Sequence, residues 1–454
     1  MPAVQLNAPG YAVPLPRIAL FQKLFIVKIL IFDSLFYLFG QTVPLLQQGA
    51  LHLGAAVLTP LACALALTSK GARAGLWLLV GLRVLDVALT WPYTINHLFL
   101  EAVLLAGLAF AEGEPAGAAR DQGRALYARW ASVLFLSVWW YAGVQKLFHG
   151  YYLSGEMFGL EGIADDRGLT LGLSGAVTVL LQGAAAVLGG TVPHVSAAAL
   201  TDRVDLAMPG WMPIFLVVIS SGIVLGELVV PALFLWPRLR RLATVLLGIM
   251  QLGIAISSME IDFAIDNFLF LLLLYPARDP LPAAATAPAP PGLYRSFRAA
   301  SLGLLLAWPV AHMGLVSTLD FSSWRFFGWG MYATPDLWHL PAVYVRGSDG
   351  ALAPLTVPPT DPAVLDAYRP VRVFRRPDAV VAYADAALQA TNQQAAGPLV
   401  VVVTTPRMDV LGGFLYTTNR VYAVEAGQAR ELGRFSTEAA SYDAELQRIA
   451  VTSW

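Results

Sequence analysis

Charged residues are scarce in this sequence: only 13% of the 454 residues are Asp, Glu, Lys or Arg, whereas 57% are apolar. A soluble domain carries about 25% charged residues, so this composition favours a membrane protein. The formal net charge of −1 argues against nucleic acid as a partner, because nucleic-acid-binding surfaces need an excess of Lys and Arg. The one cysteine, Cys63, excludes an intramolecular disulfide and a cysteine-cluster metal site. The first apolar segment lacks the small-residue cleavage site of a signal peptide and is interpreted as a spanning helix.

Long apolar runs predict about nine transmembrane helices, since crossing a bilayer takes about 20 apolar residues. The predicted spans are residues 18–40, 49–68, 74–91, 95–111, 127–149, 212–236, 242–259, 262–276 and 297–318. Lys and Arg concentrate in alternate loops, and the positive-inside rule then predicts a cytoplasmic N-terminus and an external C-terminal tail. We therefore expect an integral protein of the bacterial plasma membrane.

Residues 171–190 are apolar enough to suggest a tenth span. Counting them would place the basic cluster Arg238–Arg241 outside, against the positive-inside rule. We therefore interpret residues 150–211 as an external excursion that carries a surface or re-entrant helix.

The composition changes after Asp320. Residues 342–345, 399–403 and 420–424 are predicted strands, and residues 378–393 have helical character. The expected fold is an all-α polytopic membrane domain at residues 1–318, followed by a small extracytoplasmic α+β domain at residues 319–454.

Ionisable residues inside apolar runs are functional candidates, because burying a charge in a spanning helix is unfavourable. His97 and Glu101 are four residues apart and share a helix face. Two potential ligands make a weak metal site, and no metal is predicted. Arg83 and Asp86, three residues apart, are interpreted as a structural ion pair. Other polar residues in the runs are Lys28, Asp33, Glu227, Glu260, Asp262 and Asp266.

Lys146 stands near the end of the run at residues 127–149. In one interpretation its ammonium group reaches the headgroup region and has no further role. In the other, an amine withdrawn from water loses part of the stabilisation of its charged form and can act as a general base near neutral pH. An apolar cavity beside it would suit a lipid-soluble cofactor such as a quinol.

The segment Tyr141-Ala142-Gly143-Val144-Gln145-Lys146-Leu147, followed by Tyr152 and Gly155, resembles a signature of the vitamin K-dependent γ-glutamyl carboxylases and their bacterial relatives, the HTTM (horizontally transferred transmembrane) proteins. Further resemblances occur in the family's order, at Asn96-His97, at Glu227 with Pro231, at Arg238–Arg241 and at residues 325–332. Gln251 stands where the family commonly has a histidine.

The resemblance implies that Lys146 is the base that deprotonates a reduced, vitamin K-like quinone and that His97 handles the reacting oxygen. Oxygen then converts the quinol to an epoxide through a strongly basic alkoxide, which takes a γ-proton from glutamate before carbon dioxide is captured. The expected cofactor-binding residues are Asn96, Trp140, Tyr141 and Gln251. The expected partners are membrane lipids, the quinol, and a peptide, protein or other carbon acid on the extracytoplasmic side.

Two other interpretations stay open. The chain could be a non-catalytic HTTM protein that acts in maturation, immunity or transport through a protein partner, with Lys146 paired structurally to a carboxylate. A third reading is an ion or solute carrier that uses Asp33, Asp86 and Glu227.

Overall fold

A computed structural model of the chain describes most of its length. The described residues are 13–35, 49–90, 96–163, 174–195, 202–257, 261–275, 292–319, 340–347, 350–358, 361–374, 376–392 and 398–452. They form two compact units, each made of several segments of the chain. Unit 1 consists of residues 1–144, 225–313 and 324–329, and unit 2 consists of residues 145–224, 314–323 and 330–454. The predicted domain boundary between residues 318 and 319 stays a prediction.

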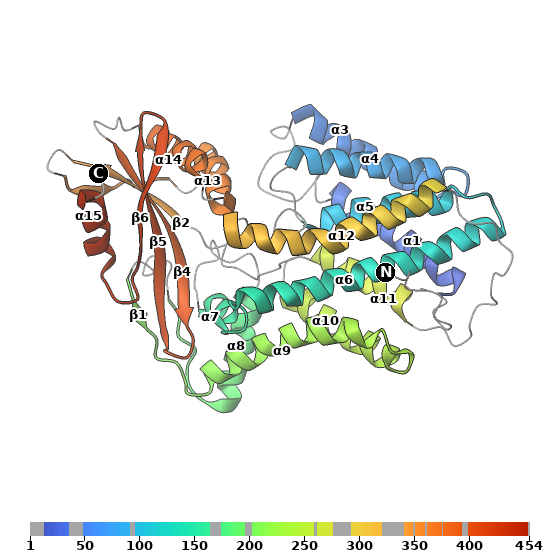
Figure 1. Ribbon diagram of the computed structural model, residues 1–454, viewed down its shortest axis with the longest axis horizontal. Helices are drawn as coiled ribbons and strands as arrows, with labels where there is room; N and C mark the ends of the chain where they lie inside the picture. The colour runs from blue at the N-terminus through green and yellow to red at the C-terminus, as the bar shows by residue number, and fades with distance from the viewer. Residues whose placement is uncertain are drawn as a thin grey trace. The chain divides into compact units, whose positions relative to one another are not determined.

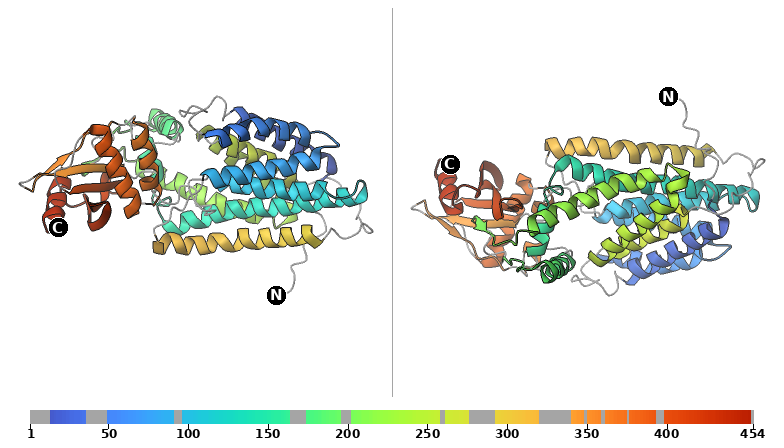
Figure 2. Two further views of the ribbon diagram at one scale, coloured as in Figure 1. Left: turned by 90° about the horizontal axis from the view of Figure 1, so that it is seen from above. Right: turned by 90° about the horizontal axis from the view of Figure 1, so that it is seen from below.

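Unit 1 is built from helices that run alongside one another, as both views of Figure 2 show. Its helices, some continuing into unit 2, are α1 (Leu15–Ile29) with the π-helical turn η1 (Leu30–Leu35), α3 (Gly49–Ala66), α4 (Ala72–Thr90), α5 (Asn96–Glu112), α6 (Ala118–His149), α9 (Met212–Leu233), the 3-10 turn η4 (Pro237–Leu239), α10 (Arg240–Ser257), α11 (Ile261–Leu274) and α12 (Gly292–Leu319). Buried aromatic rings join three of them. Phe270 of α11 stacks on Phe135 of α6 with centroids 4.2 Å apart and lies 5.4 Å from Phe21 of α1. Such offset pairs stabilise packing beyond simple area burial.

Unit 2 contains an antiparallel sheet in the order β1-β5-β4-β2-β3, with β6 also paired to β5. The strands are β1 (Val204–Asp205), β2 (Leu340–Arg346), β3 (Leu352–Pro354), β4 (Leu399–Asp409), β5 (Phe414–Glu425) and β6 (Gln428–Ser436). The helices of this unit are α7 (Glu156–Ile163), α8 (Ser174–Leu188), α13 (Pro362–Phe374), α14 (Pro377–Thr391) and α15 (Tyr442–Thr452).

Side-chain alternation along β4 explains why helices cover both faces of this sheet. Val401 and Val403 pack with α13 and α14, whereas Val400 and Val402 pack with α15. Figure 1 shows α14 and α15 on opposite sides of the strands. Because successive residues of a strand point to opposite faces, a strand buried on both faces is a continuous apolar run.

The predicted strands at 342–345, 399–403 and 420–424 are confirmed as parts of β2, β4 and β5, and the predicted helix at 378–393 is confirmed as α14. The predicted excursion at 150–211 contributes α7, α8 and also β1, which pairs with β5 through Val204–Leu415 and Asp205–Phe414. The family-like segment at residues 325–332 lies outside the described residues.

The prediction of about nine transmembrane helices is wrong. Apolar runs were correctly placed as helices, but among the described residues only α9 is long and apolar enough to cross a membrane. Some helices are too short, since α11 has 14 residues where about 20 are needed. Others carry several charged residues, as α6 does with Arg120, Asp121, Arg124, Arg129 and Lys146.

The expected all-α polytopic membrane domain is therefore replaced by a mostly helical chain that also contains a six-stranded sheet. The location predicted from it, a multi-pass integral protein of the plasma membrane with a cytoplasmic N-terminus and an external C-terminal domain, is likewise wrong. It depended on alternating spans, and one candidate span in the described part of the chain does not supply them.

Candidate functional site

Lys146 lies in the last turn of α6, and its side chain is buried with 2% of the residue exposed. Its Nζ lies 4.8 Å from the centroid of the Tyr152 ring, within the range of a cation–π interaction. The helix ends directly after this turn, where the carbonyl of Lys146 accepts a hydrogen bond of 3.1 Å from the Gly150 N–H. Neighbouring Gln145 is also fully buried.

Two glycines of the family-like segment have structural reasons to be glycine. A Cβ on Gly143 would lie 2.9 Å from Cγ of Leu228 and 3.0 Å from Cβ of Glu227, so α6 and α9 approach too closely there for a side chain. Gly155 has φ +78°, and a Cβ there would lie 3.0 Å from backbone atoms of Leu216 and Val217. A larger residue would therefore disturb the packing at both positions, one before and one after Lys146 in the chain.

The aromatic residues predicted to bind a cofactor have different environments. Trp140 is 43% exposed, whereas Tyr141 is 9% exposed. The Tyr141 hydroxyl donates a hydrogen bond of 2.5 Å to the carbonyl of Leu306 on α12. Its oxygen is thereby engaged in holding two helices of unit 1 together.

His97 and Asn96 begin α5, but their side chains lie outside the described residues. The joint role predicted for Lys146 and His97 stays a prediction. Glu101, one turn further along α5, is only 1% exposed, and its carboxylate accepts hydrogen bonds from Lys28 and Arg83. Glu101, which the sequence places on the same helix face as His97, is therefore part of an ion-pair network.

This network is the main charged cluster of unit 1. Lys28 donates to Glu101 and, at 3.0 Å, to Asp266 on α11. Arg83 donates to Glu101 at 2.5 Å and to Asp86 at 3.3 Å, which confirms the predicted pair of Arg83 with Asp86. Burial raises the pKa of Asp266 well above its ordinary value, and the charge of Glu101 raises it further, although Lys28 lowers it. The side chain of Asp33, another polar residue of the first apolar run, lies outside the described residues.

A second buried acidic group lies in unit 2, at the start of α7. Glu156 is 3% exposed and accepts two hydrogen bonds from Arg407 of β4, at 2.6 and 2.9 Å, and a third of 2.8 Å from the Met408 N–H. Burial alone would lower the Arg407 pKa, but the bonds to Glu156 and its charge raise it above the ordinary value. The guanidinium group also lies 5.9 Å from the Tyr151 ring centroid.

Glu161, near the end of α7, differs from Glu156. It is 2% exposed, and its Oε2 has no hydrogen-bond partner among the described residues. Burial raises the pKa of Glu161 to about 8, so its carboxyl group holds a proton at neutral pH.

Sequence reasoning missed both glutamates of α7. Their signal was present, since two acidic residues stand in the apolar segment Glu156–Ile163. The partner of Glu156 was not visible in the sequence, because Arg407 lies 251 positions away.

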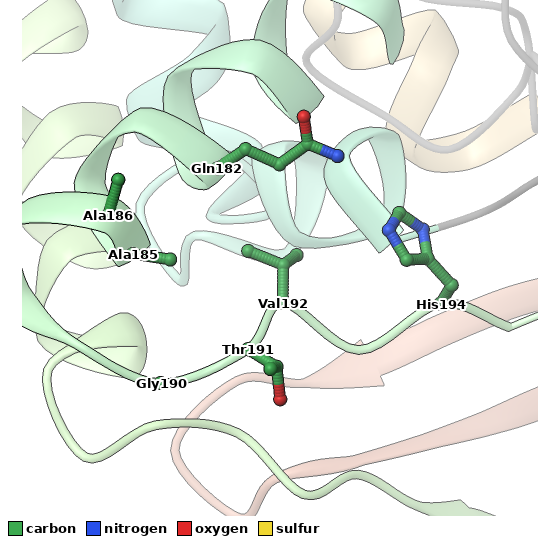
Figure 3. A pocket seen from close by; sticks show the side chains of 7 residues that line it. All are labelled: Gln182, Ala185, Ala186, Gly190, Thr191, Val192 and His194. Carbon is green, nitrogen blue, oxygen red and sulfur yellow. The ribbon is translucent and has the colours of Figure 1, made fainter.

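A separate open pocket of about 370 Å³ lies in unit 2 at the end of α8. Figure 3 shows the imidazole of His194 on one side of the pocket and the methyl groups of Ala185 and Ala186 on the other, with the amide of Gln182 and the side chain of Val192 between these two sides. The Thr191 hydroxyl points away from Gln182 (Figure 3). None of the residues predicted to form the site lines this pocket.

No protein-family model matches the chain, and neither a curated protein nor a solved structure does. The resemblance to carboxylases and HTTM proteins therefore stays a prediction carried by the residues named above.

Proposed function

We propose that this chain is a carboxylase-like enzyme in which Lys146 is the general base toward a hydroxyl group of a reduced quinone, with a carbon acid or a glutamyl peptide as the second substrate. The observation that carries the proposal is the burial of Lys146, with 2% of the residue exposed, inside the segment that resembles the carboxylases. Lysine is almost never fully buried unless its charge is paired, so a buried lysine is held by specific contacts such as the one with Tyr152.

The chemistry of the two described residues fits a quinol. A neutral amine accepts a hydroxyl proton, and an aromatic face such as that of Tyr152 packs against a flat ring. When bound, a reduced quinone supplies an acidic hydroxyl group and an electron-rich ring that oxygen can oxidise. The Nζ atom of Lys146 takes the proton and becomes an ammonium group. The ring of Tyr152, 4.8 Å away, stabilises that positive charge where hydration is poor.

The test uses the purified full chain with vitamin K hydroquinone, oxygen, bicarbonate and a glutamate-containing peptide, and it measures epoxide formed and carbon dioxide incorporated. Lys146→Ala and Lys146→Arg are expected to lose activity, because alanine has no base and guanidinium stays charged. Lys23→Arg, on the exposed lysine of α1, is the matched control and is expected to retain it.

Variants of Tyr152 separate a role in charge stabilisation from simple packing. Tyr152→Phe keeps the aromatic face and is expected to keep kcat, whereas Tyr152→Leu removes it and is expected to lower kcat roughly 2- to 30-fold. Melting temperatures of all variants, followed by tryptophan fluorescence, identify any loss of activity that is due to unfolding. Equal activity in wild-type protein and in both Lys146 variants would defeat the proposal.

A second candidate function, a non-catalytic HTTM-like protein that acts through a protein partner, is favoured by Tyr141 and Trp140. The Tyr141 hydroxyl is bonded to a backbone carbonyl and Trp140 is largely exposed, so neither is arranged around a bound ring. In this case vitamin K hydroquinone leaves the melting temperature unchanged, and a protein partner co-purifies in equal amount with the wild-type chain and with Lys146→Ala.

A further inference from the structure

Helices α10 and α11 pack as antiparallel neighbours in unit 1, and one contact fixes their register. A Cβ on Gly248 of α10 would lie 3.6 Å from Cδ1 of Leu271 on α11. One turn further along α10 stands Gln251, and one turn back along α11 stands Asn267. Residues three or four apart share a helix face, so Gln251 and Asn267 face each other across this seam at about the same level.

Both amides are completely buried, each with 0% exposed. Neither the nitrogen nor the oxygen of either amide has a hydrogen-bond partner within the described ranges of the chain. Leaving a buried amide without a partner costs about 1–3 kcal/mol, so such groups usually mark an unseen ligand, ion or water.

The residue before Asn267 on α11 is a buried acidic residue. Asp266 is 5% exposed; its Oδ2 accepts a hydrogen bond from Lys28, but its Oδ1 has no partner among the residues that the structure describes. Asp266 belongs to the network of Lys28, Arg83, Asp86 and Glu101.

We propose that one small monovalent cation binds at the α10–α11 seam. Its ligands are Oε1 of Gln251, Oδ1 of Asn267 and Oδ1 of Asp266. Carboxylate and amide oxygens are ligands for hard cations that do not prefer nitrogen or sulfur. The three ligands are one carboxylate and two neutral amides, so a single positive charge balances them, whereas a divalent ion would leave the buried site with an excess of positive charge. The proposal does not involve Lys146 and does not rest on the carboxylase-like function, but it gives Gln251 a role in cation binding in place of the cofactor contact predicted from the sequence.

The experiment measures the melting temperature of the purified full chain at pH 8 in sodium chloride, potassium chloride or choline chloride at constant ionic strength. A ligand that binds only the folded state raises the melting temperature in a saturable manner. Sodium or potassium is expected to raise it by at least about 2 °C over choline, which is too large to enter the site.

Gln251→Leu and Asn267→Leu are expected to abolish this response. In choline both variants are expected to melt at or above the wild-type temperature, because each removes a buried amide without a partner. Gln182→Leu, on an exposed glutamine of unit 2, is the control and keeps the response.

Asp266→Asn provides a second test if a leucine variant does not fold, and it too is expected to remove the cation response. The proposal is overturned if sodium, potassium and choline give the same melting temperature. It is equally overturned if the folded Gln251→Leu, Asn267→Leu or Asp266→Asn variant responds to the cation as the wild-type chain does.

Discussion

Glu101 in unit 1 and Glu161 in unit 2 are buried to nearly the same extent, 1% and 2% exposed, yet their surroundings differ. The carboxylate of Glu101 accepts hydrogen bonds from Lys28 and Arg83. Glu161 has an oxygen without a hydrogen-bond partner in the described part of the chain, and burial raises its pKa to about 8. Burial alone therefore does not decide the charge of an acidic group. Hydrogen bonds from cations hold Glu101 in ion pairs, whereas at Glu161 desolvation by burial raises the pKa and favours the protonated carboxyl group.

Removing Lys28, which donates to the carboxylate of Glu101, should have the largest effect on stability. Lys28→Ala leaves the carboxylates of Glu101 and Asp266 buried with one cation fewer. A broken buried pair costs about 3–5 kcal/mol, and we expect the free energy of unfolding to fall by that amount. Urea unfolding followed by tryptophan fluorescence measures it, with Lys23→Ala at an exposed site as the control, expected within about 0.5 kcal/mol of wild type. A loss below about 1 kcal/mol for Lys28→Ala would contradict the role given to the pair.

The pH dependence of stability tests whether Glu161 is protonated in the folded chain. The pKa of Glu161 is about 8 in the folded chain against an ordinary 4.5, so in this window the folded state binds a proton that the unfolded state has lost. Stability therefore falls as pH rises from 4.5 to about 8, by up to about 1.4 kcal/mol per pH unit. Glu161→Gln should remove this slope from the unfolding free energy measured across the window.

The matched control for that measurement is Glu425→Gln, at an exposed glutamate of β5 in the same unit. It should leave the wild-type slope unchanged. Identical slopes for the wild-type chain and Glu161→Gln would mean that Glu161 does not hold a proton in the folded state.

Glu156 is intermediate between the two, since it is buried but its partner Arg407 has a side chain that is 31% exposed. Glu156→Gln keeps the shape but removes the charge of an ion pair that water partly screens. We expect a loss of about 1–3 kcal/mol in urea unfolding. Asp378→Asn, in the exposed pair with Arg376, should cost less than about 1 kcal/mol. Equal costs for the two substitutions would show that burial of Glu156 adds nothing to its pair.

Local patterns of the sequence predicted much of the secondary structure. The apolar runs gave the positions of the helices, and the β-branched run at 399–403 predicted β4, because both patterns are short-range. Arg83 and Asp86 were correctly paired because they lie one helical turn apart. Transmembrane spans were wrongly inferred from the same apolar runs, since helices packed within a protein are also apolar.

Long-range features could not be predicted from those patterns. Strand β1 has two residues and exists because it pairs with β5, about 210 positions later in the chain. Lys28 was noted as a buried cation, but its partners Glu101 and Asp266 lie 73 and 238 positions away. The close approach of Leu228 and Glu227 to Gly143, and of Leu216 and Val217 to Gly155, is likewise long-range, and the sequence shows only that both positions are glycine.

The most direct test of the central claim is the ratio of epoxide formed from vitamin K hydroquinone by Lys146→Arg to that formed by the wild-type chain, at equal amounts of folded protein. If Lys146 Nζ accepts the quinol proton, turnover should fall at least about 100-fold, since a lost general base costs 10²–10⁴ in rate. Lys146→Arg turning over at the wild-type rate would contradict the assignment of Lys146 as the base.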